Sequence, residues 1–395
     1  MKSKLALVPL TLGGFGIGMT EFVMMGILPD IAKAMRITIP AAGHFISAYA
    51  LGVVVGAPLL VALTVKMPPK RILALLMGLF AVGNGLSVLA SSYHLMLLTR
   101  FLSGLPHGAF FGVGAVVAGR LAEPGKEARA ISMMFAGLTF ANIIGVPIGT
   151  YLGHNYGWQI PFMLIVVVAS LTVLSVWRWL PNLPAKVTNL RQEFQAFTHL
   201  EPWMIIGITI LGNGGFFAWF SYIVPLFTEV AGFSNNAVTF LMVLAGVGMS
   251  LGNLLGGWLT DRISPLRATT WLLVAMATSL LLIPAAAQYQ VSTVLITMLT
   301  GALAFSTAAP IQMLMIRSAK GSEMLASSLS QSGFNTGNAL GAYLGGLPIA
   351  AGLGYTSPEW VGAALVVGGI LFCVALVLRR RKRATVALPE IAAAR

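Results

Sequence analysis

Long apolar segments recur along this chain of 395 residues, and they limit its possible folds more than any other feature. Each is about as long as the ~20 residues that a helix needs to cross a bilayer. The twelve segments lie near residues 5–28, 42–64, 72–91, 96–119, 130–152, 159–180, 203–227, 238–260, 268–287, 291–316, 324–351 and 360–378. Only 9% of the residues are charged, whereas soluble domains carry about 25%. The sequence therefore predicts an all-α membrane protein with twelve transmembrane helices.

The basic residues indicate how the chain is oriented. With both termini in the cytoplasm, all of the 24 Lys and Arg residues fall in cytoplasmic segments except Lys33, Arg36 and Arg100. Helical membrane proteins concentrate basic residues on the cytoplasmic side, so we expect a multi-pass protein of the inner (plasma) membrane with this orientation. The net charge of +13 is then a topology signal, and nucleic acid is not an expected partner. The basic run 379–383 is expected to meet anionic lipid head groups.

The chain divides into two related halves. We expect an N-terminal six-helix bundle at 1–180, a cytoplasmic linker at 181–202, a C-terminal six-helix bundle at 203–379 and a basic cytoplasmic tail at 380–395. An offset of 196 residues superimposes eight residues of the first half on identical residues of the second. The pairs are Pro29–Pro225, Gly52–Gly248, Gly56–Gly252, Pro69–Pro265, Arg71–Arg267, Asn142–Asn338, Gly145–Gly341 and Gly149–Gly345. Parallel six-helix repeats are a recurrent transporter architecture, so we expect two pseudo-symmetric bundles that rock about a central site.

Two ionisable residues stand out inside the predicted spans. A charge at the bilayer centre costs at least about 2.5–3.5 kcal/mol, so Glu21 and Arg100 are candidates for function. We hypothesise that Glu21 binds a coupled proton and that Arg100 sets its affinity; a permanent structural salt bridge is the alternative. His107 lies two helical turns beyond Arg100 on the same face, where a proton relay and a neutral hydrogen-bonding role are equally compatible with the sequence.

The second half offers amides and aromatic rings, and we place no charge inside its predicted spans. Amides beside aromatic faces suit hydroxylated or amphiphilic neutral ligands, and aromatic faces also suit lipophilic cations. For any single aromatic residue, ordinary packing is the competing interpretation. The candidate substrate contacts of both halves are Asn142, Asn213, Phe217, Trp219, Tyr222, Asn335 and Asn338.

Several segments resemble motifs of a known family. RFLSGLPHGAFFGVGAVV resembles a span-4 arginine motif, with Arg100 and Gly104 as its elements, and GLTFANIIGVPIGTYLG is similar to the span-5 antiporter signature. GGWLTDRISPLR after the eighth predicted span is similar to a gating motif. Over its whole length the chain resembles the major facilitator superfamily, in particular the twelve-span drug:proton antiporter branch and, within it, the arabinose efflux permease and related sugar or drug exporters.

The resemblance implies roles for these residues. Spans 1 and 4 line the central cavity of that family, so an ion pair or a shared water network between Glu21 and Arg100 is expected. The span-5 signature implies export. The gating residues implied are Gly145, Pro147, Gly149, Asp261 and Arg262. The loop after span 2 departs from the pattern, because VALTVKMPPKR contains no acidic residue and cannot carry the gating aspartate.

The function we expect is therefore proton-coupled antiport of a small molecule, either a sugar such as arabinose or a drug-like compound, by alternating access. The alternatives are a passive facilitator or importer of the same fold and a non-transporting membrane sensor. The sequence has neither a Walker-type phosphate loop nor an HExxH motif, and we expect no enzymatic activity, cofactor or metal. The expected partners are the substrate, protons and membrane lipids, and the expected state is a monomer.

Overall fold

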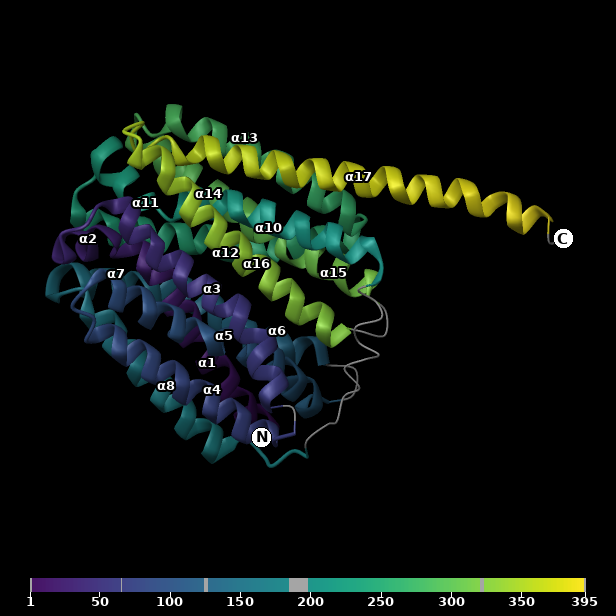
Figure 1. Ribbon diagram of the computed structural model, residues 1–395, viewed down its shortest axis with the longest axis horizontal. Coiled ribbons are helices and arrows are strands. Elements are labelled where there is room, and N and C mark those ends of the chain that lie inside the picture. The colour runs from purple at the N-terminus through teal and green to yellow at the C-terminus, as the bar shows by residue number, and fades with distance from the viewer. Residues whose placement is uncertain (1, 65, 124–126, 185–197, 320–322, 394–395) are drawn as a thin grey trace.

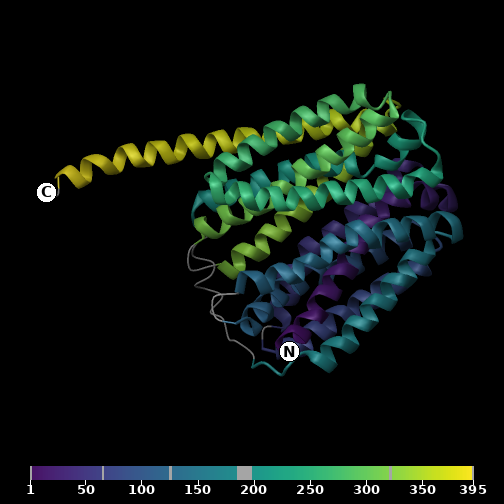
Figure 2. The ribbon, with the colours of Figure 1, turned by 180° about the vertical axis from the view of Figure 1, so that it is seen from behind.

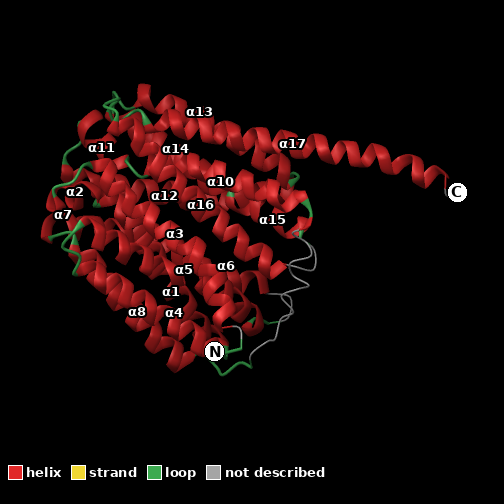
Figure 3. Ribbon diagram, in the orientation of Figure 1, coloured by secondary structure: helices red, strands yellow, loops and turns green. Residues whose placement is uncertain are grey.

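The computed structural model of the chain describes residues 2–64, 66–123, 127–184, 198–319 and 323–393. These residues form helices joined by short connections, and no strand occurs among them (Figure 3). In chain order the helices are α1 (Lys2–Gly26), α2 (Leu28–Met35), α3 (Ile39–Thr64), α4 (Pro69–Val88), α5 (Tyr93–Leu121), α6 (Glu127–Phe140), η1 (Ala141–Gly145), α7 (Val146–Tyr156), α8 (Gln159–Trp179), α10 (Leu200–Phe220), α11 (Ile223–Pro225), η3 (Leu226–Val230), α12 (Asn235–Arg262), α13 (Pro265–Ala286), α14 (Gln290–Ser306), α15 (Ala308–Ser318), α16 (Glu323–Ala350) and α17 (Pro358–Ala393).

Eleven helical segments of the described chain are long and apolar enough to cross a membrane. The remaining predicted span, 324–351, corresponds to α16, which has 28 residues but carries several Ser, Asn and Gly residues. α16 packs against α3 of the first half and against α10 and α17 of its own half. Its polar residues therefore face protein instead of lipid over much of its length. The predicted all-α membrane fold of two six-helix bundles is confirmed.

Three predicted spans are divided into shorter helices. The span at 130–152 consists of α6, the π-helical turn η1 and α7, the span at 203–227 consists of α10, α11 and the start of η3, and the span at 291–316 consists of α14 and α15. Pro147 lies in the first turn of α7, where its ring cannot donate a hydrogen bond to the preceding turn. Directly before Pro147, the N–H of Val146 donates to the carbonyl of Ala141, which lies five residues earlier. The helix is thus interrupted directly before Pro147 by a π-helical turn.

The two halves lie side by side in Figures 1 and 2, the first coloured purple through blue and the second teal through green to yellow. α3 packs against α16, and α12 packs against η1 and α7, so each half contributes to both contacts. α2 and α11 lie at one end of the bundle, which we call the distal end (Figure 1). At the opposite, proximal end α8 ends and α10 begins. α17 is one helix that continues past residue 380, and its C-terminal part projects beyond the proximal end of the bundle (Figure 1).

Equivalent glycines allow close helix contacts in both halves. A Cβ on Gly52 of α3 would meet the carbonyl of Phe101 on α5, and a Cβ on Gly248 of α12 would meet the carbonyl of Met298 on α14. Small residues let backbones approach where no hydrophobic effect drives helix association. The repeated glycines at the 196-residue offset therefore support the same helix pairing in each bundle.

Candidate functional site

The carboxyl group of Glu21 lies at the contact between the two halves. Oε1 of Glu21, on α1, accepts a hydrogen bond of 2.8 Å from Nδ2 of Asn338 on α16. The adjacent Phe22 is buried, and its ring centroid lies 6.0 Å from that of Phe217 and 6.0 Å from that of Phe305, both in the second half. The half-buried Glu21 carboxyl thus faces the other bundle.

Arg100 is fully buried on α5 and binds the residue that precedes Glu21. Its two terminal nitrogens donate hydrogen bonds of 3.1 Å to the hydroxyl and to the carbonyl oxygen of Thr20. The Thr20 hydroxyl in turn donates to Oδ1 of Asn84 on α4 at 2.6 Å. Glu21 and Arg100 interact electrostatically, but among the described residues no ion pair joins them. Thr20 supplies two acceptors to the guanidinium where a direct ion pair was one of the two expected arrangements, and the shared water network stays a prediction.

Tyr49 connects Arg100 to His107 within the first half. The guanidinium carbon of Arg100 lies 4.4 Å from the ring centroid of Tyr49 on α3. The Tyr49 hydroxyl is 3.0 Å from Nδ1 of His107, and either group can donate depending on the histidine tautomer. His107 is buried, and its ring lies beside that of Phe111. Asn84, Thr20, Arg100, Tyr49 and His107 therefore form one continuous polar network, with Glu21 at its edge.

Amide side chains continue the site into the second half. Nδ2 of Asn213, on α10, donates to Oδ1 of Asn338 and also to the carbonyl oxygen of Phe334 at 2.8 Å. Asn335 is buried, donates to the carbonyl of Gln331 at 3.1 Å, and its own Oδ1 has no partner among the described residues. Asn213 and Asn338 thus join Glu21 in one cluster across the two halves.

The candidate aromatic contacts have different surroundings. Phe217 is buried against Phe22 at the contact between the halves. Trp219 is buried, and its ring packs on Phe216 and Phe220. The Tyr222 hydroxyl donates to the carbonyl of Ala342 at 2.7 Å. Of these three rings, Phe217 is the one that lies beside the Glu21 cluster.

The distal end of the site is closed by contacts between the halves. The hydroxyl of Ser47, on α3, donates to the carbonyl of Ala339 on α16 at 2.9 Å. The ring of Tyr222 lies where a Cβ on Gly43 of α3 would stand. The rings of His44 and Tyr343, one from each half, have centroids 5.6 Å apart. The structure is therefore a state in which the two bundles meet on their distal side.

The span-5 residues form a second contact between the halves. Asn142 is buried in η1, and its backbone lies against Gly246 of α12, where a Cβ would meet the Asn142 carbonyl. Gly145 and Gly149 lie against side chains of α1, and Pro147 begins α7. Asn142 therefore lies in the contact with α12 and contributes its backbone there.

Asp261 and Arg262 end α12 at the proximal side of the bundle, remote from the Glu21 cluster. Both are exposed. The Arg262 guanidinium lies 4.5 Å from the ring centroid of Trp258. Asp261 has no ion pair with any residue that the structure describes. The gating role expected of these two residues stays a prediction.

One buried acidic residue of the second half lies directly before the last predicted span, 360–378, and was not among the candidates. Glu359 lies in the first turn of α17, and only 1% of its surface is exposed. Within the described chain, neither carboxyl oxygen has a hydrogen-bond partner outside its own residue. The sequence reading missed it because Glu359 directly follows Pro358 at a helix start, where acidic residues are common and usually solvated. The uncharged members of the first-half network, Thr20 and Tyr49 above all, were also missed.

The described residues contain no group of three or more His, Cys, Asp or Glu side chains that could hold a metal ion. The arrangement provides a carboxyl group on one half and an amide donor on the other, joined by a hydrogen bond across the contact between the halves. A buried arginine network lies on one side of that carboxyl, and aromatic rings lie on the other.

The comparisons with known proteins identify the family. The sequence profile described as Major Facilitator Superfamily matches residues 10–324 and 234–394. The chain belongs to the major facilitator superfamily. It is 42% identical over 355 residues to AraJ of Escherichia coli (strain K12), an alignment that covers 89% of this chain and 90% of AraJ. It is also 39% identical over 387 residues to the inner membrane transport protein YdhP of the same strain, covering 98% and 99%.

A further relative and a solved structure are also similar to this chain. The major facilitator chain is 29% identical over 369 residues to a probable sugar efflux transporter of Helicobacter acinonychis (strain Sheeba), covering 92% and 93% of the two chains. The crystal structure of a D-xylose-proton symporter superposes with a TM-score of 0.77 at 15% identity, covering 94% of this chain and 97% of that chain. The structural likeness shows the fold alone. The resemblance to the arabinose and sugar efflux group is confirmed, and the protein is a transporter, not an enzyme.

Proposed function

We propose that this protein exports a small molecule across the inner membrane in exchange for protons, by alternating access. The observation that carries the proposal is the hydrogen bond between Glu21 and Asn338, which joins an intramembrane carboxyl to the opposite half. A carboxyl group that binds and releases a proton needs an environment that differs between the two end states of the cycle. Rocking of the halves changes this environment directly, because it makes or breaks the Asn338 bond.

The sequence of events follows from the closed distal end. In the present state the Asn338 amide donates to Glu21, and such a donor stabilises a carboxylate. Opening the distal side separates α1 from α16, which removes this donor and admits water to the carboxyl from that side. Proton uptake then belongs to the distal-open state and proton release to the distal-closed state. An exchange in which the proton enters from the distal side and the substrate leaves there meets these conditions.

Several observations support export and this orientation. The span-5 signature is similar to that of antiporters, and one relative is named a sugar efflux transporter. The relative YdhP is named an inner membrane transport protein. The basic residues favour cytoplasmic termini, which makes the proximal end the cytoplasmic one. We propose that residues 1–180 and 203–379 move as the two rocking units of a monomer.

The site suits a sugar such as arabinose or an amphiphilic drug-like compound. The Asn213, Asn335 and Asn338 amides supply donors and acceptors for hydroxyl groups. Phe22 and Phe217 supply apolar faces beside the Glu21 carboxyl, which also suits a lipophilic cation. Arabinose and tetraphenylphosphonium therefore serve as probes of the two substrate classes.

The experiment uses everted membrane vesicles that contain the full chain and a pH-sensitive dye. With an imposed proton gradient, each probe is expected to release protons from wild-type vesicles while it accumulates inside them. Glu21→Gln keeps the amide contact to Asn338 but cannot exchange a proton, so we expect probe-driven proton release to be lost. Exchange of the probe across the membrane without a gradient should persist, because substrate contacts remain.

Glu201→Gln is the matched control, because Glu201 is a carboxyl on α10 paired with Arg380 at the proximal end. It should leave proton coupling at the wild-type level. Normal coupling in Glu21→Gln would overturn the assignment of Glu21. Proton and probe movement in the same direction would show an importer, and probe movement indifferent to the proton gradient would show a facilitator; either result overturns the proposed antiport.

A further inference from the structure

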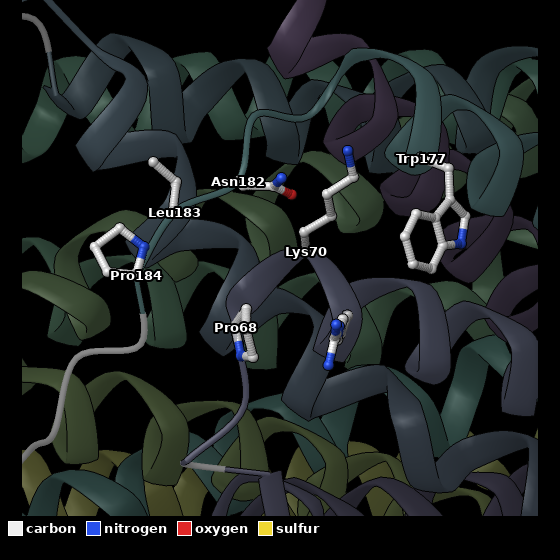
Figure 4. Close-up of a pocket in the computed structure, with 7 residues that line it drawn as sticks. Pro68, Lys70, Trp177, Asn182, Leu183 and Pro184 are labelled. Atoms are coloured by element: carbon white, nitrogen blue, oxygen red, sulfur yellow. The ribbon is translucent and has the colours of Figure 1, made fainter.

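A basic cavity lies at the proximal end of the first half, away from the Glu21 cluster. It has a volume of about 540 Å³ and is formed where α4 begins, where α8 ends and where the chain leaves α8. Lys70, Arg71, Trp177 and Asn182 line it together with nearby Pro and Leu residues. Figure 4 shows the Lys70 side chain extending between Asn182 and Trp177. The loop before α4 is the one that departs from the family's gating pattern.

The cavity is positively charged. Its lining contains two basic residues and no acidic residue. Lys70 places its Nζ 5.7 Å from the ring centroid of Trp177, and neither Lys70 nor Arg71 has an ion-pair partner among the residues that the structure describes. Arg120 adds a third cation at the rim, where it donates to the carbonyl of Pro184 at 2.9 Å. The cavity therefore attracts an anion.

The apolar surface next to the cavity indicates what kind of anion. Leu174 lies one helical turn before Trp177 on α8, and their exposed fractions are 64% and 54%. Trp179, at the end of the same helix, is 39% exposed. Exposed tryptophans at a helix end mark the membrane–water interface, and exposed leucines beyond them mark the acyl-chain region. The cavity thus opens at head-group depth beside a surface fit for hydrocarbon chains.

The loop before α4 differs in charge from the equivalent loop before α13 in the second half. Pro69 and Arg71 correspond to Pro265 and Arg267 at the 196-residue offset, but Lys70 corresponds to Leu266, which is buried. The second loop retains Asp261, whereas the first loop has no acidic residue. The additional cation and the missing carboxylate are specific to the first half. Arg267 is therefore a natural control for Arg71.

We propose that this cavity binds the phosphate of an anionic phospholipid head group. Lys70 and Arg71 bind the phosphate, Asn182 offers an amide to the polar head group, and Trp177 and Leu174 contact the glycerol and the first part of an acyl chain. Basic pockets at the ends of transmembrane helices bind such head groups through the same chemistry. The inference does not depend on the transport direction or on the coupled ion.

The test uses the purified full chain in detergent, with native mass spectrometry and thermal unfolding as readouts. Phosphatidylglycerol, phosphatidylcholine and inorganic phosphate are titrated separately. Wild-type protein is expected to retain phosphatidylglycerol and to unfold at a higher temperature in its presence, with little effect of the other two. The double variant Lys70→Gln/Arg71→Gln is expected to bind phosphatidylglycerol about 30-fold more weakly, from the typical contribution of two basic residues near an anionic surface.

Two further variants separate the contribution of the cavity cations from that of other basic and aromatic residues. Arg267→Gln should retain wild-type binding, and Trp177→Leu, which keeps the apolar surface and both cations, should bind with intermediate affinity. Equal protection by inorganic phosphate would show a site for a soluble anion and overturn the lipid assignment. Unchanged binding in the double variant, or equal loss in Arg267→Gln, would show non-specific attraction and also overturn it.

Discussion

At the scale of single residues, the Glu21 carboxyl and the Arg100 guanidinium are held by different partners. Arg100 binds Thr20 inside its own half, so its position does not depend on how the halves are arranged. Glu21 binds Asn338 of the opposite half, so its environment does. In the proposed mechanism, a rigid-body motion of the halves would move Asn338 while Arg100 stays in place, and this would change the affinity of Glu21 for a proton.

The burial of Glu359 leads to a prediction about the unfolding temperature of the protein. Gln keeps the volume of this buried side chain and removes an ionisable group that has no partner in the described residues. An unpaired buried charge is unfavourable, so Glu359→Gln should unfold at a temperature at least as high as the wild type. Glu201→Gln, which breaks the pair with Arg380, should unfold at a lower temperature. A clear loss of stability in Glu359→Gln would mean that the carboxyl is needed in its charged form.

Asp30 supplies a prediction of pH dependence. Its carboxyl, on α2, lies 3.0 Å from Nδ1 of His154. Burial raises the pKa of Asp30 above its ordinary value of 3.8, although the hydrogen bond to His154 opposes the shift. The folded state therefore binds this proton more tightly than the unfolded chain. The stabilisation is present at low pH and is lost as the pH rises through the raised pKa.

Asp30→Asn removes this titration while it keeps a polar contact for His154. The stability of the variant relative to wild type should therefore increase as the pH is raised from about 4 to about 7. Thermal unfolding across this range checks the trend, and Glu229→Gln, an exposed distal carboxyl, serves as the control. A relative stability that falls with pH would contradict the expectation.

At the scale of elements, the contact between α12 and η1 depends on one missing side chain. A Cβ at Gly246 would meet the backbone of Asn142, whereas a Cβ at Gly257 of the same helix would meet nothing within 4 Å. We expect Gly246→Ala to separate α12 from η1 and to slow transport. Gly257→Ala should leave the contact between α12 and η1 unchanged and add up to about 1 kcal/mol of helix stability.

Spin labels at Tyr151 and Thr239, which line the groove between α7 and α12, measure this separation. The distance distribution should broaden or lengthen in Gly246→Ala and should match the wild type in Gly257→Ala. An unchanged distribution in Gly246→Ala would show that the contact tolerates a methyl group.

The sequence predicts the helices well because a bilayer imposes a length and a composition on each span. It predicts Glu21 and Arg100 because intramembrane charges are rare. It does not predict Thr20 or Tyr49 as members of the same network, since uncharged polar residues are frequent in transmembrane helices and their partners depend on helix rotation. The π-helical turn at η1, which lies against α12, is also not predicted, although Pro147 indicates where the regular helix must fail.

At the scale of the whole molecule, alternating access requires the distal contact to open. Ser47 and Ala339 lie in different halves and are joined by a hydrogen bond of 2.9 Å. A Cys373→Ser background that carries Ser47→Cys and Ala339→Cys should be cross-linked by a short bifunctional thiol reagent, because the two sites are adjacent in the distal-closed state. Cross-linking should abolish transport, and reduction of a cleavable cross-linker should restore it.

The two single-cysteine variants treated in the same way are the controls for this experiment. They should transport before and after treatment, because neither can join the halves. Full transport by the cross-linked double variant would show that the cycle does not require the distal contact to open. That result would remove the physical basis for two rocking bundles.

The polar character of α16 also bears on how the chain is made. A segment with this many Ser, Asn and Gly residues enters a bilayer less readily than its neighbours do. We expect it to integrate during biosynthesis only once α10 has been inserted and α17 follows, because these helices cover its polar surface. The polar residues that we propose as substrate contacts thus make the insertion of this helix dependent on the rest of its bundle.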